Sequence, residues 1–249
     1  MPSGRTLHDN QDGYRAPNTM RPSPPPFPIA ESVAAGLRAT IETRLRAFER
    51  HPHDDANLRH AAVAVAITDE GFGANLPGLP APSIWSERAA LILTRRAETL
   101  RDHAGQWALP GGRIEPGETP ERAALRELHE EVALELDARA VLGRLDDFVT
   151  RSGYVITPVV VWAGAAREML PNPDEVQSIH RIPIDEFMRA DAPILEPTAD
   201  PARPVLKMPV ARQWIAAPTA AVIYQFREVC IGGRITRVAH FDQPAFAWK

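Results

Sequence analysis

The sequence has a single cysteine, Cys230, among its 249 residues, and it has no long apolar run. One cysteine excludes an intramolecular disulfide and makes a reducing compartment the natural setting. No stretch approaches the roughly 20 apolar residues needed to span a bilayer, and the polar N-terminus does not resemble a secretory signal. The C-terminus matches neither a prenylation nor a peroxisomal signal. We therefore expect a soluble, cytoplasmic chain without membrane attachment.

An excess of positive charge is also missing. The chain has 28 Lys and Arg against 32 Asp and Glu, a formal net charge of −4. This balance gives no electrostatic case for a nucleic-acid or membrane partner. A local group of arginines can still hold a compact anion, so we expect a small-molecule ligand.

The composition divides the chain into three parts. Residues 1–30 end in RPSPPPFP and lack the apolar residues that would offset ordering entropy, so we predict a disordered proline-rich tail; a proline-motif ligand is the alternative. Residues 31–57 carry apolar side chains at helical spacing between Ser32 and Phe48, which predicts an amphipathic helix packed on the main domain, and then a linker. Residues 58–249 form the main domain with a C-terminal extension.

The main domain alternates strand and helix patterns. We predict strands at 61–67, 89–94, 107–109, 138–145 and 155–162, and a short one at 178–182. Helices are expected at 120–132, 183–188 and 218–229, and a glycine- and proline-containing loop at 71–83. This order fits a mixed α/β domain with helices on both sides of a sheet.

The helix at 120–132 has an unusual acidic side. Glu127, Glu130 and Glu131 are spaced at i, i+3 and i+4, where like charges cost a few tenths of a kcal/mol per pair in an isolated helix. A divalent cation would reverse that sign, because Mg²⁺ and Mn²⁺ prefer oxygen ligands. A solvated acidic face is the alternative. The neighbouring Glu118 and Arg126 favour a metal site, since a guanidinium can hold a carboxylate in place.

The segment around this helix resembles the Nudix box, a pattern of glycine, glutamates and arginine at fixed spacing. The matching positions are Gly112, Glu118, Arg126, Glu127, Leu128, Glu130, Glu131 and Leu134. Ala133 stands where the box has its last glycine, and an alanine there is strained if the backbone needs a positive φ.

The resemblance implies a Nudix-type α/β/α sandwich with a mixed sheet, here with an added N-terminal helix. It also implies that Glu127 and Glu131 are the main ligands of Mg²⁺ or Mn²⁺, and that Glu130 is a further ligand or binds through water. Arg126 would orient the glutamates, and Glu118 would support the loop or a further metal. The implied reaction is hydrolysis of a diphosphate, in which the cation neutralises phosphate charge and a carboxylate accepts a proton.

The stretch just upstream is similar to the signature of the coenzyme A diphosphatase subfamily. The matching residues are Leu93, Thr94, Arg96, Ala97, Arg101, Gly105, Pro110, Gly111 and Gly112. Leu109 departs from the pattern, because an aromatic residue is usual there. Physically, the stretch places three arginines within seven residues, and coenzyme A carries a 3′-phosphate besides its diphosphate. We predict a substrate-binding set of Arg95, Arg96, Arg101, His103, Gln106, Gly111 and Gly112; the alternative is that the arginines are solvated or pair with Glu98 and Asp102.

A third block, SGYVITPVVVW followed by NPDEV, resembles a later strand and turn of the same family. By that resemblance Glu175 would join the metals or act as general base, with Asp174 as second choice. The aromatic segment at 240–248 has three open roles, which are to cover the core, to complete the site or to meet a second subunit in a homodimer.

The leading hypothesis is therefore a metal-dependent coenzyme A diphosphatase (pyrophosphatase) that forms 3′,5′-ADP and 4′-phosphopantetheine or its acyl derivative. A Nudix hydrolase for another nucleoside diphosphate, such as ADP-ribose, is the second. A nucleotide sensor that does not cleave its ligand is the third, and the retention of every box carboxylate argues against it.

Overall fold

The structure, a computed structural model, describes residues 33–100 and 103–244. The predicted tail at 1–30 lies outside the described residues. The helices are α1 (Val33–Ala47), α2 (Pro120–Val132), α3 (Ile184–Phe187) and α4 (Thr219–Phe226). The strands are β1 (Arg59–Gly71), β2 (Ser86–Arg96), β3 (Trp107–Ala108), β4 (Gly111–Arg113), β5 (Val141–Arg144), β6 (Phe148–Val149), β7 (Tyr154–Gly164), β8 (Val176–Pro183), β9 (Ile194–Glu196), β10 (Val205–Val210) and β11 (Gln213–Ala216).

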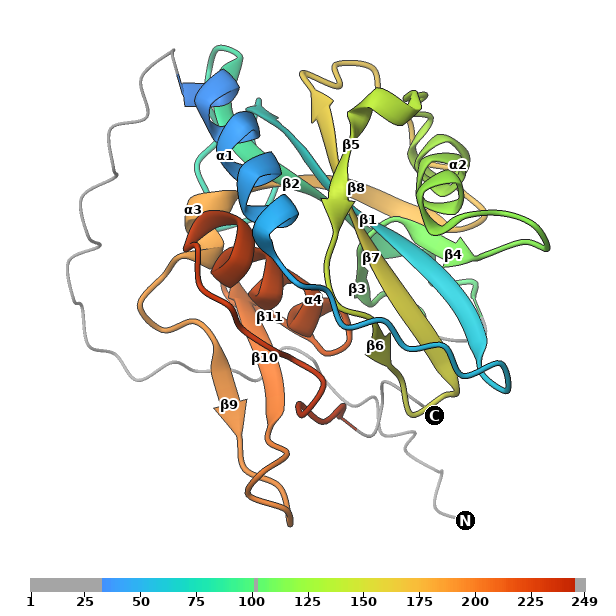
Figure 1. Ribbon diagram of the computed structural model, residues 1–249. Coiled ribbons are helices and arrows are strands. Elements are labelled where there is room, and N and C mark those ends of the chain that lie inside the picture. The colour runs from blue at the N-terminus through green and yellow to red at the C-terminus, as the bar shows by residue number, and fades with distance from the viewer. Residues whose placement is uncertain (1–32, 101–102, 245–249) are drawn as a thin grey trace, which may run out of the picture.

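A mixed sheet forms the centre of the fold (Figure 1). Its main path runs β3-β2-β1-β7-β5, with β1 parallel to β7 and antiparallel to β2. Three further strands join it, since β4 pairs with β1, β6 with β7 and β8 with β2. A separate three-stranded sheet, β11-β10-β9, follows along the chain.

Strand alternation gives the sheet two apolar faces. On β1, Ala62, Ala64 and Ala66 point to one face and pack with α2, while Val65 and Ile67 point to the other. That second face is covered by α1, α4 and the small sheet (Figure 1). The alanines leave room for α2 to lie close to the strand. The predicted α/β/α arrangement with a mixed sheet and an N-terminal helix is confirmed.

The bounds of α2 agree with the prediction of 120–132. Thr119 caps its N-terminus, where its hydroxyl accepts a hydrogen bond from the Arg122 backbone N–H, and Pro120 occupies the first turn. Ala133 ends the helix in the left-handed region, with φ 56° and ψ 29°. The position of the missing glycine therefore does need a positive φ.

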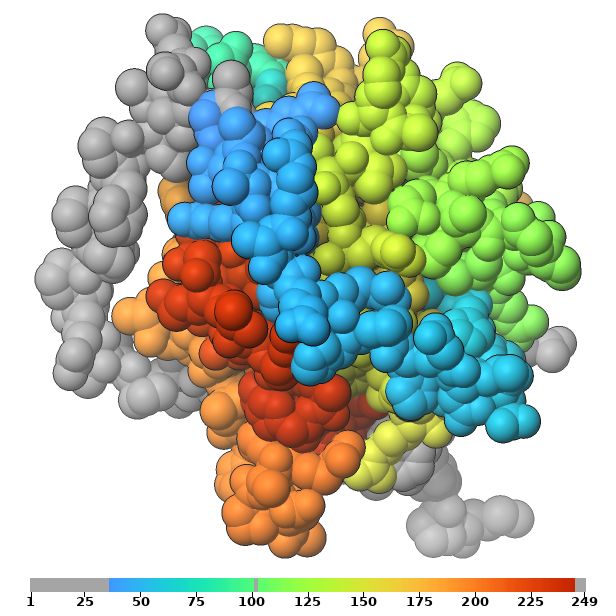
Figure 2. All heavy atoms as spheres, in the orientation of Figure 1, coloured from blue at the N-terminus to red at the C-terminus, as the bar shows by residue number. Residues whose placement is uncertain are grey.

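Helix α1 lies beside the C-terminal part of the chain. Ile41 and Leu45 are buried in the core, and the Arg44 guanidinium donates to the carbonyls of Cys230 and Ile231 at 2.8 and 2.6 Å. In Figure 2 the blue surface of α1 and the red C-terminal surface adjoin. The two ends of the described chain thus stabilise each other. No helix among the described residues is long and apolar enough to cross a membrane.

Several elements differ from the sequence-based expectations. The predictions missed β4, β6 and the small sheet β9–β11, whose segment contains prolines that weaken a strand pattern, including Pro209 within β10 itself. The predicted strand at 138–145 begins as a short 3-10 turn, Ala138–Ala140, before β5. The strand β8 is longer than the predicted 178–182, and α4 ends at Phe226 before a π turn, Arg227–Ile231.

Candidate functional site

Two glutamates of α2 are buried against the two glycines that begin β4. Glu127 and Glu131 are 8% and 4% exposed, on the edge of α2 that faces β4. A Cβ atom placed on Gly112 of β4 would lie 2.6 Å from Cδ of Glu127, and one on Gly111 would lie 2.7 Å from Cα of Val63. Only glycine allows β4 to lie so close to the Glu127 carboxylate.

Arg126 connects the loop before α2 to the glutamates on it. Its Nε and Nη2 donate to the two carboxylate oxygens of Glu118, at 3.0 and 3.1 Å. Its Nη1 donates to Glu127 and Glu130, both at 2.8 Å. The Arg126 guanidinium keeps the pKa of Glu118 below its ordinary value. The fork predicted from the sequence is therefore formed, and it holds three carboxylates.

A second segment brings Glu175 to the same place. The backbone N–H of Asn172 donates to the Glu131 carbonyl at 2.9 Å, which ties the loop before β8 to the end of α2. The backbone N–H of Ala97 donates to the Glu175 carbonyl, also at 2.9 Å. Residues of the upstream signature and of the NPDEV turn are thus joined by backbone hydrogen bonds that fix the position of Glu175.

These contacts bring together three carboxylates. Carboxylate oxygens of Glu127, Glu131 and Glu175 lie within 4.8 Å of one another, and Glu175 is the exposed member. Glu130 and Glu118 are outside this cluster among the described residues, and both accept hydrogen bonds from Arg126, as Glu127 does. Glu130, with a side chain 52% exposed, is the more open of these two.

The electrostatics of the cluster suit a cation. Burial, together with the neighbouring Glu127 charge, raises the pKa of Glu131 to about 8, and burial also raises the pKa of Glu127. The three carboxylates offer hard oxygen donors, which fit Mg²⁺ or Mn²⁺, and the charge of such a cation would favour the ionised forms of Glu127 and Glu131. Glu127, Glu131 and Glu175 are the described residues that could hold such an ion.

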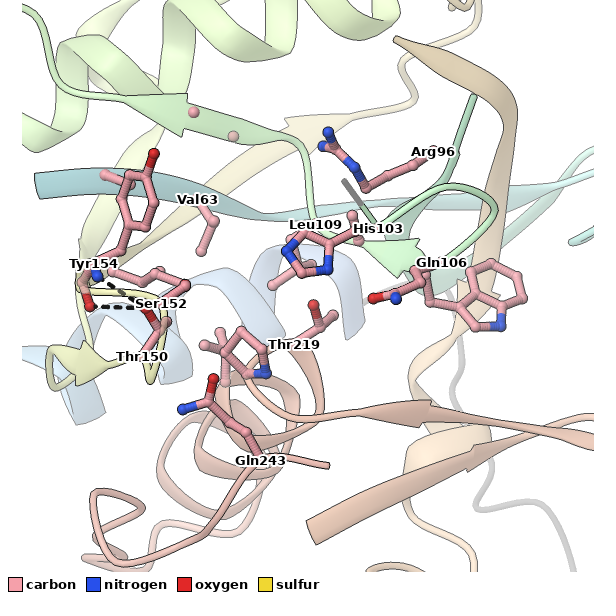
Figure 3. A pocket seen from close by; sticks show the side chains of 18 of the residues that line it. Val63, Arg96, His103, Gln106, Leu109, Thr150, Ser152, Tyr154, Thr219 and Gln243 are labelled. Atoms are coloured by element: carbon pink, nitrogen blue, oxygen red, sulfur yellow. Dashed lines mark hydrogen bonds between the residues drawn. The ribbon is translucent and has the colours of Figure 1, made fainter. Parts of the chain in front are cut away.

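A cavity of about 480 Å³ lies on the face of the sheet opposite α2, and none of the three carboxylates is among its lining residues. Gly112 lines the cavity and also lies directly against the Glu127 carboxylate, so this glycine adjoins both. Figure 3 shows Tyr154, Ser152 and Thr150 on one side of the cavity, and His103 and Gln106 on the other.

The predicted substrate-binding residues fall into three groups. Those that line the cavity are Arg96, His103, Gln106, Gly111 and Gly112. Arg95 is not part of this lining: its Cζ lies 4.0 Å from the Trp107 ring centroid, and its guanidinium donates to the Gly105 carbonyl and to Gln213. Arg101 lies outside the described residues.

Other cavity residues were missed from the sequence. Arg59 and Arg113 line it beside Tyr154, and Thr219 and Gln243 reach it from the C-terminal part (Figure 3). Arg113 follows the first box glycine, which is a signal that could have found it. The other positions match no motif, and only the folded chain brings them together.

Comparison with known proteins identifies a family match that includes the segment from Gly112 to Leu134. The model of the NUDIX domain family matches residues 77–205 of the chain. "Nudix hydrolase 3" of Caenorhabditis elegans is 37% identical over 106 residues, which cover 41% of this chain and 44% of that protein. The "Uncharacterized Nudix hydrolase NudL" of Yersinia pestis (strain Pestoides F) is 42% identical over 108 residues, 43% of this chain and 54% of that protein. The matches thus span about half the length of these relatives.

Solved structures are similar at low identity. The chain matches a MutT/nudix family protein from Enterococcus faecalis with a TM-score of 0.45 and 14% identity, over 82% of this chain and 75% of that one. A Nudix hydrolase from M. smegmatis, RenU, matches with a TM-score of 0.43 and 22% identity, over 72% of this chain and 89% of that one.

Proposed function

The chain belongs to the Nudix family, and from this premise we propose that it hydrolyses the diphosphate of coenzyme A or its thioesters. The products would be 3′,5′-ADP and 4′-phosphopantetheine or its acyl derivative. The observation that carries the proposal is the cluster of Glu127, Glu131 and Glu175. It lies next to a cavity whose lining includes Arg96 and Gly112, the glycine that touches the Glu127 carboxylate. A bond between two phosphates needs both a cation site and a basic contact for its negative oxygens.

The residues have separate roles in this reaction. Glu127 and Glu131 of the cluster would hold Mg²⁺ or Mn²⁺, and Glu130, which lies outside the cluster, would be a further ligand or bind through water. The cation, when bound, would neutralise the diphosphate charge and make water a stronger nucleophile. Arg126 orients Glu127 and Glu130 through its 2.8 Å hydrogen bonds. Glu175 accepts the proton of the attacking water, because its carboxylate is exposed while its backbone is fixed.

The position of Arg96 supports the assignment of the diphosphate to this end of the cavity. Its charge favours ionisation of Glu131, and its Nε is buried without a partner in the described chain. A buried guanidinium nitrogen without an acceptor is costly, so a phosphate oxygen is its natural partner. Glu118, which the resemblance also implies as a metal residue, acts here through Arg126 and supports the loop.

We favour coenzyme A over other diphosphates as the proposed substrate because of the sequence signature from Leu93 to Gly112. ADP-ribose is the second candidate, since Leu109 lines the cavity where that signature has an aromatic residue. The distinguishing experiment offers coenzyme A, acetyl-coenzyme A, ADP-ribose and NADH in parallel to the purified chain with Mg²⁺ or Mn²⁺, and separates the products by chromatography. We expect 3′,5′-ADP from coenzyme A at the highest kcat/KM. A clear preference for ADP-ribose would overturn the assignment of the substrate.

Two amide substitutions test the roles of the carboxylates. Glu130→Gln and Glu131→Gln should each preserve the circular dichroism spectrum and lower kcat by at least about a hundredfold, because each removes an ionised oxygen ligand. Glu135→Gln, in an exposed position just beyond α2, is the matched control and should keep full activity. Near-normal turnover in either of the first two variants would show that the roles are wrongly assigned.

A further inference from the structure

The cavity carries positive charge at two separate places. Its described lining contains three arginines, Arg59, Arg96 and Arg113, and no carboxylate. Arg96 lies near Glu131, where the diphosphate is proposed to bind. Arg59 and Arg113 lie instead beside Tyr154, which Figure 3 shows at the other side of the cavity from Arg96. Two cationic positions in one cavity fit a ligand with two anionic groups.

Strand pairing explains why these side chains converge. In the parallel pairing of β1 with β7, Arg59 lies opposite Tyr154, and in the antiparallel pairing of β1 with β4, Ala61 lies opposite Arg113. Arg59 and Ala61 are two residues apart on β1, so their rows share one face of the sheet. That is the face on which the cavity opens. The convergence is therefore built into the sheet itself.

Tyr154 holds both guanidinium groups. The Cζ of Arg59 lies 3.9 Å from its ring centroid, and Nη2 of Arg59 donates to the Ser152 carbonyl at 2.6 Å. Nε and Nη2 of Arg113 donate to the Tyr154 hydroxyl at 3.0 and 2.8 Å. The two guanidinium groups repel each other because both are positively charged. Neither of them pairs with a carboxylate in the described part of the chain. The ring and hydroxyl thus hold two guanidinium groups whose charge is not neutralised.

Such a pair suits a phosphate monoester. Its doubly charged group can accept hydrogen bonds from two planar guanidinium groups at once, which is the geometry that arginine favours. The distal 3′-phosphate of coenzyme A is such a group, and it is separate from the scissile diphosphate. We propose that Arg59, Arg113 and Tyr154 form the subsite for this ribose phosphate, an assignment that rests on the proposed function.

The subsite would make substrate choice depend on the 3′-phosphate. Hydrolysis of coenzyme A would use both cationic positions, while 3′-dephospho-coenzyme A would use only the position near the glutamates. Arg59 and Arg113 are specificity residues in this scheme, because they contact a remote group and leave the diphosphate unchanged. Binding energy from such a remote group raises kcat/KM.

The test measures binding and turnover separately. Titration calorimetry compares 3′,5′-ADP with AMP, and kinetics compare coenzyme A with 3′-dephospho-coenzyme A, both in the intact chain with Mg²⁺. The variants are Arg59→Gln, Arg113→Gln and their combination. Arg46→Gln, at an exposed arginine of α1 away from the cavity, is the control of equal charge change.

We expect the native chain to bind 3′,5′-ADP at least about tenfold more tightly than AMP, and the double variant to lose that difference. The preference in kcat/KM for coenzyme A over its dephosphorylated form should fall by the same factor, with turnover of the dephosphorylated form changed less than about twofold. Equal binding of the two nucleotides by the native chain would overturn the subsite, and so would an equal loss in Arg46→Gln. Absence of coenzyme A hydrolysis combined with arginine-dependent 3′,5′-ADP binding would instead reject the proposed function and retain the subsite.

Discussion

Gly112 and Glu127 are in direct contact, with the glycine backbone of β4 against the carboxylate of α2. A Cβ on Gly112 would lie 2.6 Å from Cδ and 2.9 Å from Oε2 of Glu127, and closer still to Oε1. The carboxylate cannot retreat freely, because Arg126 holds it at 2.8 Å. This contact explains physically why the first glycine of the Nudix box is needed for the position of the Glu127 carboxylate.

The first prediction follows from this contact. Gly112→Ala should displace the Glu127 carboxylate and lower kcat by at least about a hundredfold, since a misplacement of 1 Å in a catalytic group can have that effect. Gly36→Ala is the control, because no atom lies within 4 Å of a Cβ at that helical position. Steady-state kinetics with coenzyme A and Mg²⁺ measure both variants. Normal kcat in Gly112→Ala would show that Glu127 can move without loss of function.

The sequence predicted the parts of the candidate site whose geometry depends on residues close together in the chain. The bounds of α2, the fork of Arg126 and the positive φ at Ala133 all follow from residues close together in the chain, where capping and helical spacing decide the geometry. Glu175 was also selected, through the NPDEV motif. The structure adds its backbone anchors on Ala97 and Asn172, which no spacing could indicate.

The sequence failed where the site depends on pairing of distant strands. Arg95 was expected to bind phosphate, but its guanidinium lies over the Trp107 ring and donates to the Gly105 carbonyl, and Arg95 is not among the residues that line the cavity. Arg59 was missed because its function depends on the register of β1 against β7. A register is set by long-range packing, and one sequence carries little record of it.

Arg126 provides the second prediction. Arg126→Lys keeps the positive charge but cannot hold Glu118, Glu127 and Glu130 together, because an ammonium lacks the planar fork. We expect metal affinity or kcat/KM to fall about ten- to a hundredfold, the usual effect of losing a group that orients metal ligands. Arg122→Lys, at an exposed position of the same helix, should change neither. Retention of Mg²⁺ affinity and activity in Arg126→Lys would contradict the orienting role.

Ala133 provides a prediction on stability alone. Its φ of 56° is unfavourable for a residue with a Cβ, by about 1–2 kcal/mol, whereas glycine adopts it freely. Allowing for the larger entropy of glycine in the unfolded chain, Ala133→Gly should raise the free energy of unfolding by about 0.5–1 kcal/mol. Ala39→Gly, in the exposed interior of α1, should lower it by about 1 kcal/mol. Urea denaturation measures both, and a loss of stability in Ala133→Gly would mean that the left-handed turn is not strained.

Glu131 couples stability, pH and metal in the last prediction. In the metal-free chain, burial and the Glu127 charge raise its pKa from 4.5 to about 8. Between these values the carboxyl is neutral when folded and charged when unfolded, so its contribution to stability is complete below about pH 4.5 and is lost as the pH rises through about 8. We expect the Tm measured in EDTA to fall over this range, and to fall less in Glu131→Gln, which carries no charge to bury.

A cation must displace the Glu131 proton before it binds the ionised carboxylate. The apparent affinity for Mg²⁺ should therefore rise by up to about tenfold per pH unit until about pH 8, and the Tm gain from Mg²⁺ should rise with it. Calorimetric titrations between about pH 6 and 9 measure the affinity, and Glu135→Gln is the control that should follow the native curve. An affinity for Mg²⁺ that is independent of pH below 8 would show that Glu131 is already ionised in the metal-free chain, and that its burial does not determine metal binding.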